Sequence, residues 1–141
     1  MVASFKDRIW VAWADTDAAG IVHFSNYLRY FERIEEAMFR ELGLTFPLIA
    51  LRYGIFLPRV ESRSKYLAPC RQGDELEIEI AFSQIRERSY EEEFTVRNVT
   101  TGKTAVEGSV VTVATSKEIE RAVKLPDEFL SLIKKFEKAK H

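Results

Sequence analysis

The fold of this chain is decided by one stretch, Trp13-Ala14-Asp15-Thr16-Asp17-Ala18-Ala19-Gly20-Ile21-Val22-His23-Phe24-Ser25-Asn26-Tyr27. The segment 6–14 is rich in aromatic and β-branched residues and predicts a strand. Residues 15–20 interrupt it with Asp, Thr, Ala and Gly, which favour a turn. A helix is expected to follow from Asn26. An acid in such a turn lies close to the unpaired N–H groups of a helix N-terminus, a placement that suits acyl chemistry.

A long amphipathic helix is predicted over about residues 26–42. Its apolar residues recur every three or four positions, at Tyr27, Phe31, Ile34, Met38 and Leu42. The side chain of Ser25 or Asn26 is expected to cap the first turn. Gly43 is expected to end the helix in the left-handed conformation.

The remainder of the chain predicts mostly strands. A short helix capped by Thr45 is expected over 48–53 and ends at Gly54. The pattern then changes to a period of two, which predicts four strands and a closing helix. These elements are a bent or edge strand over 55–66, interrupted at Pro58; a strand around 76–80; a strand with Tyr90, Phe94 and Val96; a hairpin turn over 98–103; a strand over 104–116; and a helix that Pro126 opens.

This order predicts an α+β fold in which a five-stranded antiparallel sheet wraps around one long central helix. With 141 residues, a single domain over 1–141 is expected. A net charge of −1 argues against nucleic-acid binding, which needs a basic face. No signal peptide or membrane-length apolar run is seen, so the expected compartment is the cytoplasm and no membrane partner is expected. Cys70 is the single cysteine, so an internal disulfide and a cysteine metal cage are excluded.

The motif resembles the active-site signature of the 4-hydroxybenzoyl-CoA thioesterase family of hot-dog-fold enzymes. The residues that carry this resemblance are Asp15-Thr16-Asp17-Ala18-Ala19-Gly20-Ile21-Val22, followed by Asn26-Tyr27. It extends over nearly the whole chain, including the segment 44–54, the turn 68–74 and the reversal 86–90. The resemblance implies the hot-dog fold and an acyl-CoA thioesterase whose coenzyme A belongs to the substrate, with no further cofactor and no metal. It also implies a homodimer or homotetramer with active sites at the dimer interface.

The resemblance assigns the catalytic roles to the turn and the helix start. Asp17 would be the catalytic carboxylate, either as nucleophile or as general base on water. The backbone N–H of Phe24 would polarise the thioester carbonyl. His23 is a weaker catalytic candidate, because several relatives carry a histidine one position later, where this chain has Phe24. The first acid, Asp15, is expected to accept hydrogen bonds within the turn.

Coenzyme A brings phosphates, for which arginine side chains are suitable partners. By resemblance, the reversal with Arg86, Arg88 and Ser89 contacts the nucleotide end of the coenzyme. Arg59 is a further candidate on the preceding strand, as are Arg63 and Lys65. The acyl pocket is expected to draw on the long helix and the segment 44–57, through Phe31, Phe46, Ile49, Tyr53 and Phe56.

Thioester hydrolysis needs a nucleophile near the carbonyl and donors where the oxyanion forms. The chain contains no Gly-x-Ser-x-Gly elbow, so an acid is the favoured nucleophile or base. The leading hypothesis is hydrolysis of a small aromatic or a short- or medium-chain acyl-CoA. Two alternatives stay open: hydrolysis of an acyl-carrier-protein thioester, and a non-catalytic acyl-CoA-binding module of the same fold. The pair of acids argues against the last, because binding alone needs no carboxylate beside a thioester.

Overall fold

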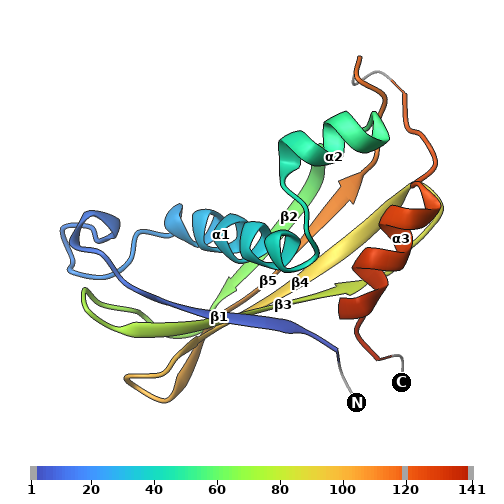
Figure 1. The fold of residues 1–141 in the computed structure, drawn as a ribbon. Coiled ribbons are helices and arrows are strands. Elements are labelled where there is room, and N and C mark those ends of the chain that lie inside the picture. The colour runs from blue at the N-terminus through green and yellow to red at the C-terminus, as the bar shows by residue number, and fades with distance from the viewer. Residues whose placement is uncertain (1–2, 119–120, 140–141) are drawn as a thin grey trace.

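The computed structural model describes residues 3–118 and 121–139 (Figure 1). The strands are β1 (Phe5–Trp10), β2 (Arg59–Tyr66), β3 (Glu75–Ser83), β4 (Ser89–Asn98) and β5 (Lys103–Val113). The helices are α1 (Asn26–Glu41), α2 (Phe46–Tyr53) and α3 (Asp127–Ile133), with 3₁₀ turns η1 (Trp13–Asp15) and η2 (Lys134–Phe136). Within the described residues, no helix combines the length and the hydropathy that crossing a membrane requires.

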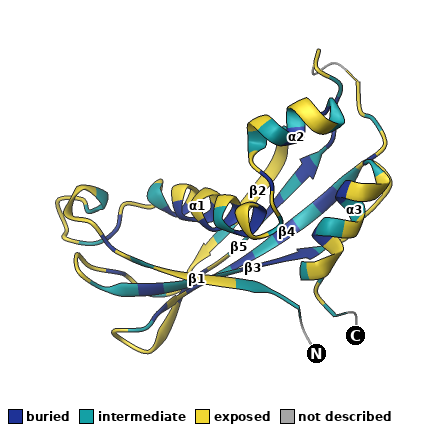
Figure 2. Cartoon of the chain, in the orientation of Figure 1, coloured by how far each residue is buried: buried dark blue, intermediate teal, exposed yellow. Residues whose placement is uncertain are grey.

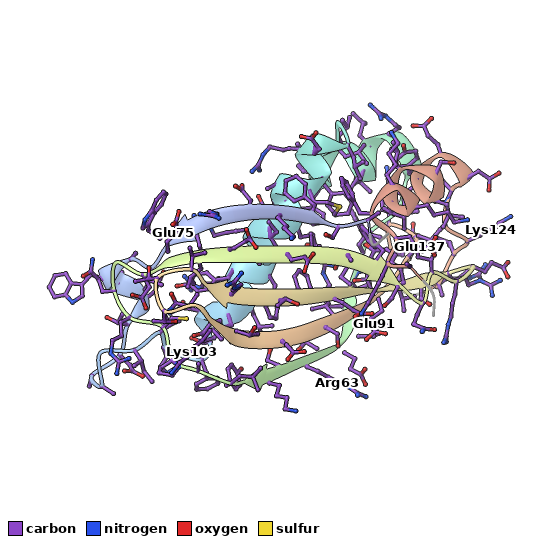
Figure 3. The ribbon with its side chains drawn as sticks, turned by 90° about the horizontal axis from the view of Figure 1, so that it is seen from below. Arg63, Glu75, Glu91, Lys103, Lys124 and Glu137 are labelled. Atoms are coloured by element: carbon purple, nitrogen blue, oxygen red, sulfur yellow. The ribbon has the colours of Figure 1, made fainter. Side chains whose placement is uncertain are left out.

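The strands form one antiparallel sheet in the order β1-β3-β4-β5-β2, and the three helices lie on the same side of it (Figure 1). Along β3, Leu76, Ile78 and Ile80 are buried against the helices, and the intervening glutamates face the other side. That open face of the sheet is seen from below in Figure 3. The predicted α+β architecture, a five-stranded antiparallel sheet around one long helix, is therefore confirmed.

Helix α1 buries one face against the sheet, as its apolar spacing predicted (Figure 2). The Phe31 ring stacks on the Phe94 ring of β4 with a centroid distance of 4.4 Å. It also lies directly over Gly108 of β5, where an added Cβ would be 2.6 Å from Phe31 Cζ. Gly108 therefore permits the close approach of helix and sheet, since any larger residue would force the ring aside.

Of the predicted helix ends, four are confirmed and one is wrong; Pro126 directly precedes α3, as predicted. Gly43 and Gly54 both have positive φ, and the Thr45 hydroxyl accepts a hydrogen bond from the Leu48 N–H at 3.2 Å. The side chains of Ser25 and Asn26 do not cap α1. The Ser25 hydroxyl pairs with His23, and the Asn26 amide donates to the Asp15 carbonyl. Both side chains hold the preceding loop instead of the helix.

Three strand boundaries differ from those predicted. The chain leaves β1 after Trp10, and residues 13–15, which include the first acid of the motif, form the turn η1. Strand β5 ends at Val113, three residues before the predicted end. Strand β2 begins only after Pro58, which has no N–H to donate to a neighbouring strand, and it occupies one edge of the sheet as predicted.

Candidate active site

The acidic turn is closed by its own backbone and fastened to the segment before β3. The Asp17 N–H donates to the Ile21 carbonyl, and the Gly20 N–H donates to the Asp17 carbonyl, both at 2.9 Å. Gly20 has a φ of 79°, a conformation that residues with a Cβ adopt at a cost. The Val22 N–H then donates to the Cys70 carbonyl at 2.8 Å. The position of Asp17 is thus set by backbone contacts on both sides.

Asp15 joins this turn to helix α1. The Tyr30 hydroxyl donates to Asp15 Oδ2 at 2.8 Å, and burial together with this bond raises the pKa of Tyr30. The Asp15 carbonyl accepts from the Asn26 side-chain amide at 2.8 Å and from the His23 N–H at 2.9 Å. The first acid of the motif therefore has the structural role that the sequence indicated, although its side chain accepts from α1 and not from the turn.

The second acid, Asp17, is exposed and forms no ion pair with any described residue. Its Oδ1 accepts from the Ala19 N–H at 2.8 Å, and no protein partner is found for Oδ2 in the described part of the chain. Asp17 borders a cavity of about 490 Å³ at the N-terminal end of α1. The other lining residues are Ile21, Val22, Phe24, Tyr27, Tyr66, Leu67, Ala68 and Pro69.

Phe24 lies on the same cavity, two residues before the first residue of α1. Its carbonyl accepts the Tyr27 N–H at 3.3 Å, whereas its own N–H has no partner among residues 3–118 and 121–139. The partial positive charge of a helix N-terminus acts at this position. A free N–H, a helix N-terminus and an accessible carboxylate on one cavity can bind a carbonyl oxygen and deliver a nucleophile to its carbon.

His23 is directed into the loop. Its Nδ1 is 2.8 Å from the Ser25 hydroxyl and accepts the Ser25 N–H at 3.3 Å, and its ring stacks on the Phe24 ring. It is not among the residues that line the Asp17 cavity. These contacts order the chain immediately before α1.

Arg59, expected to contact the coenzyme, binds buried acids of its own chain. Its guanidinium donates to both Glu35 oxygens at 2.6 and 2.7 Å, to the Thr112 hydroxyl at 2.9 Å and to Glu92 Oε1 at 3.2 Å. Glu35 and Glu92 are almost completely buried. Sequence reasoning missed this cluster, although Glu92 falls between Tyr90 and Phe94 on the inward face of a period-two strand.

Arg86, Arg88 and Ser89 lie at the β3–β4 turn, where the Arg86 N–H donates to the Ser89 carbonyl at 2.8 Å. Strand β3 begins at Glu75, whose strand neighbour is Trp10, and reaches this turn about 25 Å further along. Figure 3 shows Glu75 at one end of the sheet and Glu91, which follows the turn, toward the other. Within one protomer, these side chains are not brought to the Asp17 cavity.

The residues expected to form an acyl pocket are divided between two other cavities. Phe31 borders a cavity between α1 and β2, and Phe46, Ile49 and Phe56 border another beside α2. Tyr53 instead donates from its hydroxyl to Glu128, at the start of α3. The predicted set is therefore not one pocket.

Comparison with known proteins identifies the family. The model of the thioesterase-like superfamily matches residues 11–133. A 1,4-dihydroxy-2-naphthoyl-CoA hydrolase of Thermosynechococcus vestitus is 31% identical over 88 residues, which are 62% of this chain and 60% of that enzyme. The chain thus matches less than two thirds of this relative's length.

Solved structures share the fold. A 1,4-dihydroxy-2-naphthoyl-CoA thioesterase from Synechocystis superposes with a TM-score of 0.85 at 21% identity, covering 92% of this chain and 95% of that one. The 4-hydroxybenzoyl CoA thioesterase from Pseudomonas sp. strain CBS-3 gives a TM-score of 0.83 at 23% identity, covering 93% and 99%. The fold is thus the hot-dog fold of these thioesterases, as predicted. By its matched model and its architecture, the chain belongs to the thioesterase-like superfamily.

Proposed function

We propose that this protein hydrolyses an acyl-CoA thioester to the free acid and coenzyme A, with Asp17 as the catalytic carboxylate. The observation that carries the proposal is that Asp17 and the unpaired Phe24 N–H border the same cavity at the N-terminal end of α1. The relatives named above act on CoA thioesters, and they support the same reaction class. We expect a small aromatic or a short- or medium-chain acyl group, and the relatives' substrates favour the aromatic one.

Two routes are compatible with this arrangement. As nucleophile, the Asp17 carboxylate attacks the thioester carbon, expels the thiolate and forms a mixed anhydride that water then cleaves. As general base, Asp17 takes a proton from water, whose oxygen attacks the same carbon. In both routes the carbonyl oxygen becomes an oxyanion, which the Phe24 N–H stabilises. The products are one carboxylic acid and one thiol.

His23 has a positioning role in this proposal. Its Nδ1 is engaged by Ser25, so the ring orders the loop that presents the Phe24 N–H. No chemical step requires its imidazole, since a thiolate is a good leaving group.

The coenzyme contacts of Arg86, Arg88 and Ser89 require more than one protomer. These residues lie far from Asp17 along β3, so in the proposed enzyme they reach the coenzyme from another copy of the chain. The open edge of β2 and the exposed apolar side chains Val60, Tyr66 and Leu67 support a homodimer, or a homotetramer of two such dimers. Arg59 is left out of this set, because Glu35, Glu92 and Thr112 already occupy its donors.

The test is release of free thiol from a panel of aryl- and acyl-CoA thioesters. Asp17→Asn should lower kcat for the best substrate by roughly 10²-fold or more, as expected when a nucleophile or general base is removed. Asp127→Asn, an exposed acid of α3, is the matched control and should retain the wild-type rate. Wild-type turnover by Asp17→Asn would overturn the proposal. Comparing each CoA thioester with the matching carrier-protein thioester identifies the preferred thiol.

A further inference from the structure

A second cavity, of about 220 Å³, lies between α1 and β2, and the proposed reaction does not use it. Four apolar side chains supply its walls, namely Leu28, Phe31, Phe94 and Val110. The polar members of its lining are Glu32, Glu35, Arg59, Ser62 and Glu92. A cavity that combines apolar walls with convergent polar groups is the usual form of a small-molecule site.

In the polar lining, the buried carboxyl groups outnumber the guanidinium that pairs with them. Glu35 and Glu92 are two buried carboxyls, and among the described residues Arg59 is the one cation that contacts them. Glu92 Oε1 receives a long hydrogen bond from Arg59, whereas Glu92 Oε2 is fully buried and has no partner in the described residues. A buried polar atom without a partner is costly and is a place where a ligand can pair.

The chemistry of this set favours an uncharged ligand group. Burial and the adjacent Glu35 carboxylate raise the pKa of Glu92 well above its usual range, which favours the uncharged form of Glu92. A ligand carboxylate would meet Glu35 and the exposed Glu32 and would be repelled. A hydroxyl both donates and accepts, so it can pair with Glu92 whichever oxygen carries the proton.

The two cavities are neighbours, because residues close together along the same two elements line them. Tyr27 of the first cavity is followed directly on α1 by Leu28 of the second, and Phe31 is one turn further along. On the other wall, Tyr66 and Ser62 point to the same face of β2. From Phe24 to Glu35 the chain rises about 16 Å at helical pitch. That span exceeds one aromatic ring and suits an extended medium-chain acyl group.

We propose that the second cavity binds the far end of a medium-chain acyl group that carries a hydroxyl there, which pairs with Glu92. This inference rests on the proposed function, since it places the thioester of the same molecule at Asp17. Glu92 and Arg59 would then act in substrate selection, with no part in the bond cleavage.

The kinetic test compares three CoA thioesters of equal chain length: decanoyl-CoA, ω-hydroxydecanoyl-CoA and the ω-carboxylate derived from decanedioic acid. The wild-type protein should prefer the hydroxyl over the methyl end by roughly tenfold in kcat/KM, the value of one buried hydrogen bond, and should disfavour the carboxylate. Equal kcat/KM for the hydroxyl and methyl ends would overturn the inference.

Two variants assign the preference to Glu92. Glu92→Gln keeps a donor and an acceptor and should retain the preference for the hydroxyl, whereas Glu92→Leu should abolish it. The matched control is Glu91→Leu on the opposite face of β4, which should behave as the wild type. Persistence of the hydroxyl preference in Glu92→Leu would contradict the assignment.

A binding measurement separates this inference from the proposed reaction and does not depend on the Leu variant folding. Decanol and decanoate are titrated into the isotope-labelled wild-type protein, and the amide signals of Phe31 and Phe94 are followed by NMR. Decanol should shift these signals and bind at least roughly tenfold more tightly than decanoate. Decanol binding without thioester hydrolysis would refute the reaction and keep the cavity assignment, whereas hydrolysis without decanol binding would refute the cavity assignment alone.

Discussion

The Tyr30 hydroxyl donates to Asp15 Oδ2 at 2.8 Å and so connects the second turn of α1 to the acidic loop. Asp17 is two residues further along that loop, and it has no comparable side-chain contact with the helix. The orientation of the proposed catalytic carboxylate therefore depends on a hydrogen bond made by a different acid.

Tyr30→Phe should reduce activity without removing any group from the cavity. The loss of a hydrogen bond to a charged partner should lower the free energy of unfolding by about 1.5–3 kcal/mol. A looser loop should also lower kcat more than it raises KM, since Asp17 would be less well oriented. Urea unfolding and thiol-release kinetics check both effects. Tyr53→Phe, which loses a surface hydrogen bond to Glu128, is the control, and an equal fall in kcat there would refute the explanation.

Mixed oligomers should test whether two protomers complete one site. Asp17→Asn and Arg88→Ala chains are co-expressed with different tags, and the mixed species is purified. If Asp17 and Arg88 act from different copies, each mixed dimer contains one site with both residues intact. Its KM should then equal the wild-type KM, with kcat well above that of the Asp17→Asn homodimer. A KM equal to that of the Arg88→Ala homodimer would place both residues in the same copy, and a wild-type KM in the Arg88→Ala homodimer would remove Arg88 from the site.

The buried Glu92 should make stability depend on pH. Burial and Glu35 raise its pKa above the ordinary value of 4.5, so the folded chain keeps a proton that the unfolded chain releases. Its stabilising contribution is complete below about pH 4.5 and is lost as the pH rises toward the folded pKa, by at most about 1.4 kcal/mol per pH unit. Arg59 and Tyr90, which face the same cluster, have raised pKa values and keep their protons over this range.

Glu92→Gln should remove this pH dependence of the free energy of unfolding, because the amide does not titrate. Free energies of unfolding are measured in urea between about pH 5 and pH 8. As the pH rises, they should fall more steeply for the wild type than for the variant. Glu91→Gln, on the outward face, should follow the wild type. Parallel curves for the wild type and Glu92→Gln would show that Glu92 does not hold the proton.

Gly108→Ala should destabilise the contact between helix and sheet. The added methyl would be 2.6 Å from the Phe31 ring and 2.8 Å from the Arg63 carbonyl, so one of them must move. Overpacking of this kind typically costs about 1–3 kcal/mol. The double variant Gly108→Ala/Phe31→Leu should lose less stability than the sum of the two single variants, and strict additivity would show that the ring is not the obstacle.

Local patterns in the sequence were enough to predict the elements of the fold. The helical spacing from Tyr27 to Met38 and the alternation around Ile78 each describe one buried face, so they identified α1 and β3. The ends were less well predicted where a side chain had two available partners. Ser25 was expected to cap the helix, but the His23 ring, two residues earlier, takes its hydroxyl instead.

In the candidate site, too, local contacts were predictable from the sequence and long-range contacts were not. Asp17 and Phe24 are seven residues apart, so a local motif could place them together, and the structure has them on one cavity. Arg59, Glu35 and Glu92 come from three separate elements, and no local pattern reports that they meet. The alternation of apolar and polar residues along β4 nevertheless assigns Glu92 to the inward face. An acid on that face indicates that a buried cation lies near it.

Asp15 and Asp17, two residues apart, have different roles in the loop. One is tied into the scaffold, whereas the other stands in solvent with a single backbone contact. Replacement of Asp17 should therefore abolish turnover without changing the abundance of the protein in the cell. In a survey of gene variants, substitutions of Asp17 should not change the protein level, so a screen that measures abundance would not detect them. Substitutions of Asp15 should lower the protein level and would be detected.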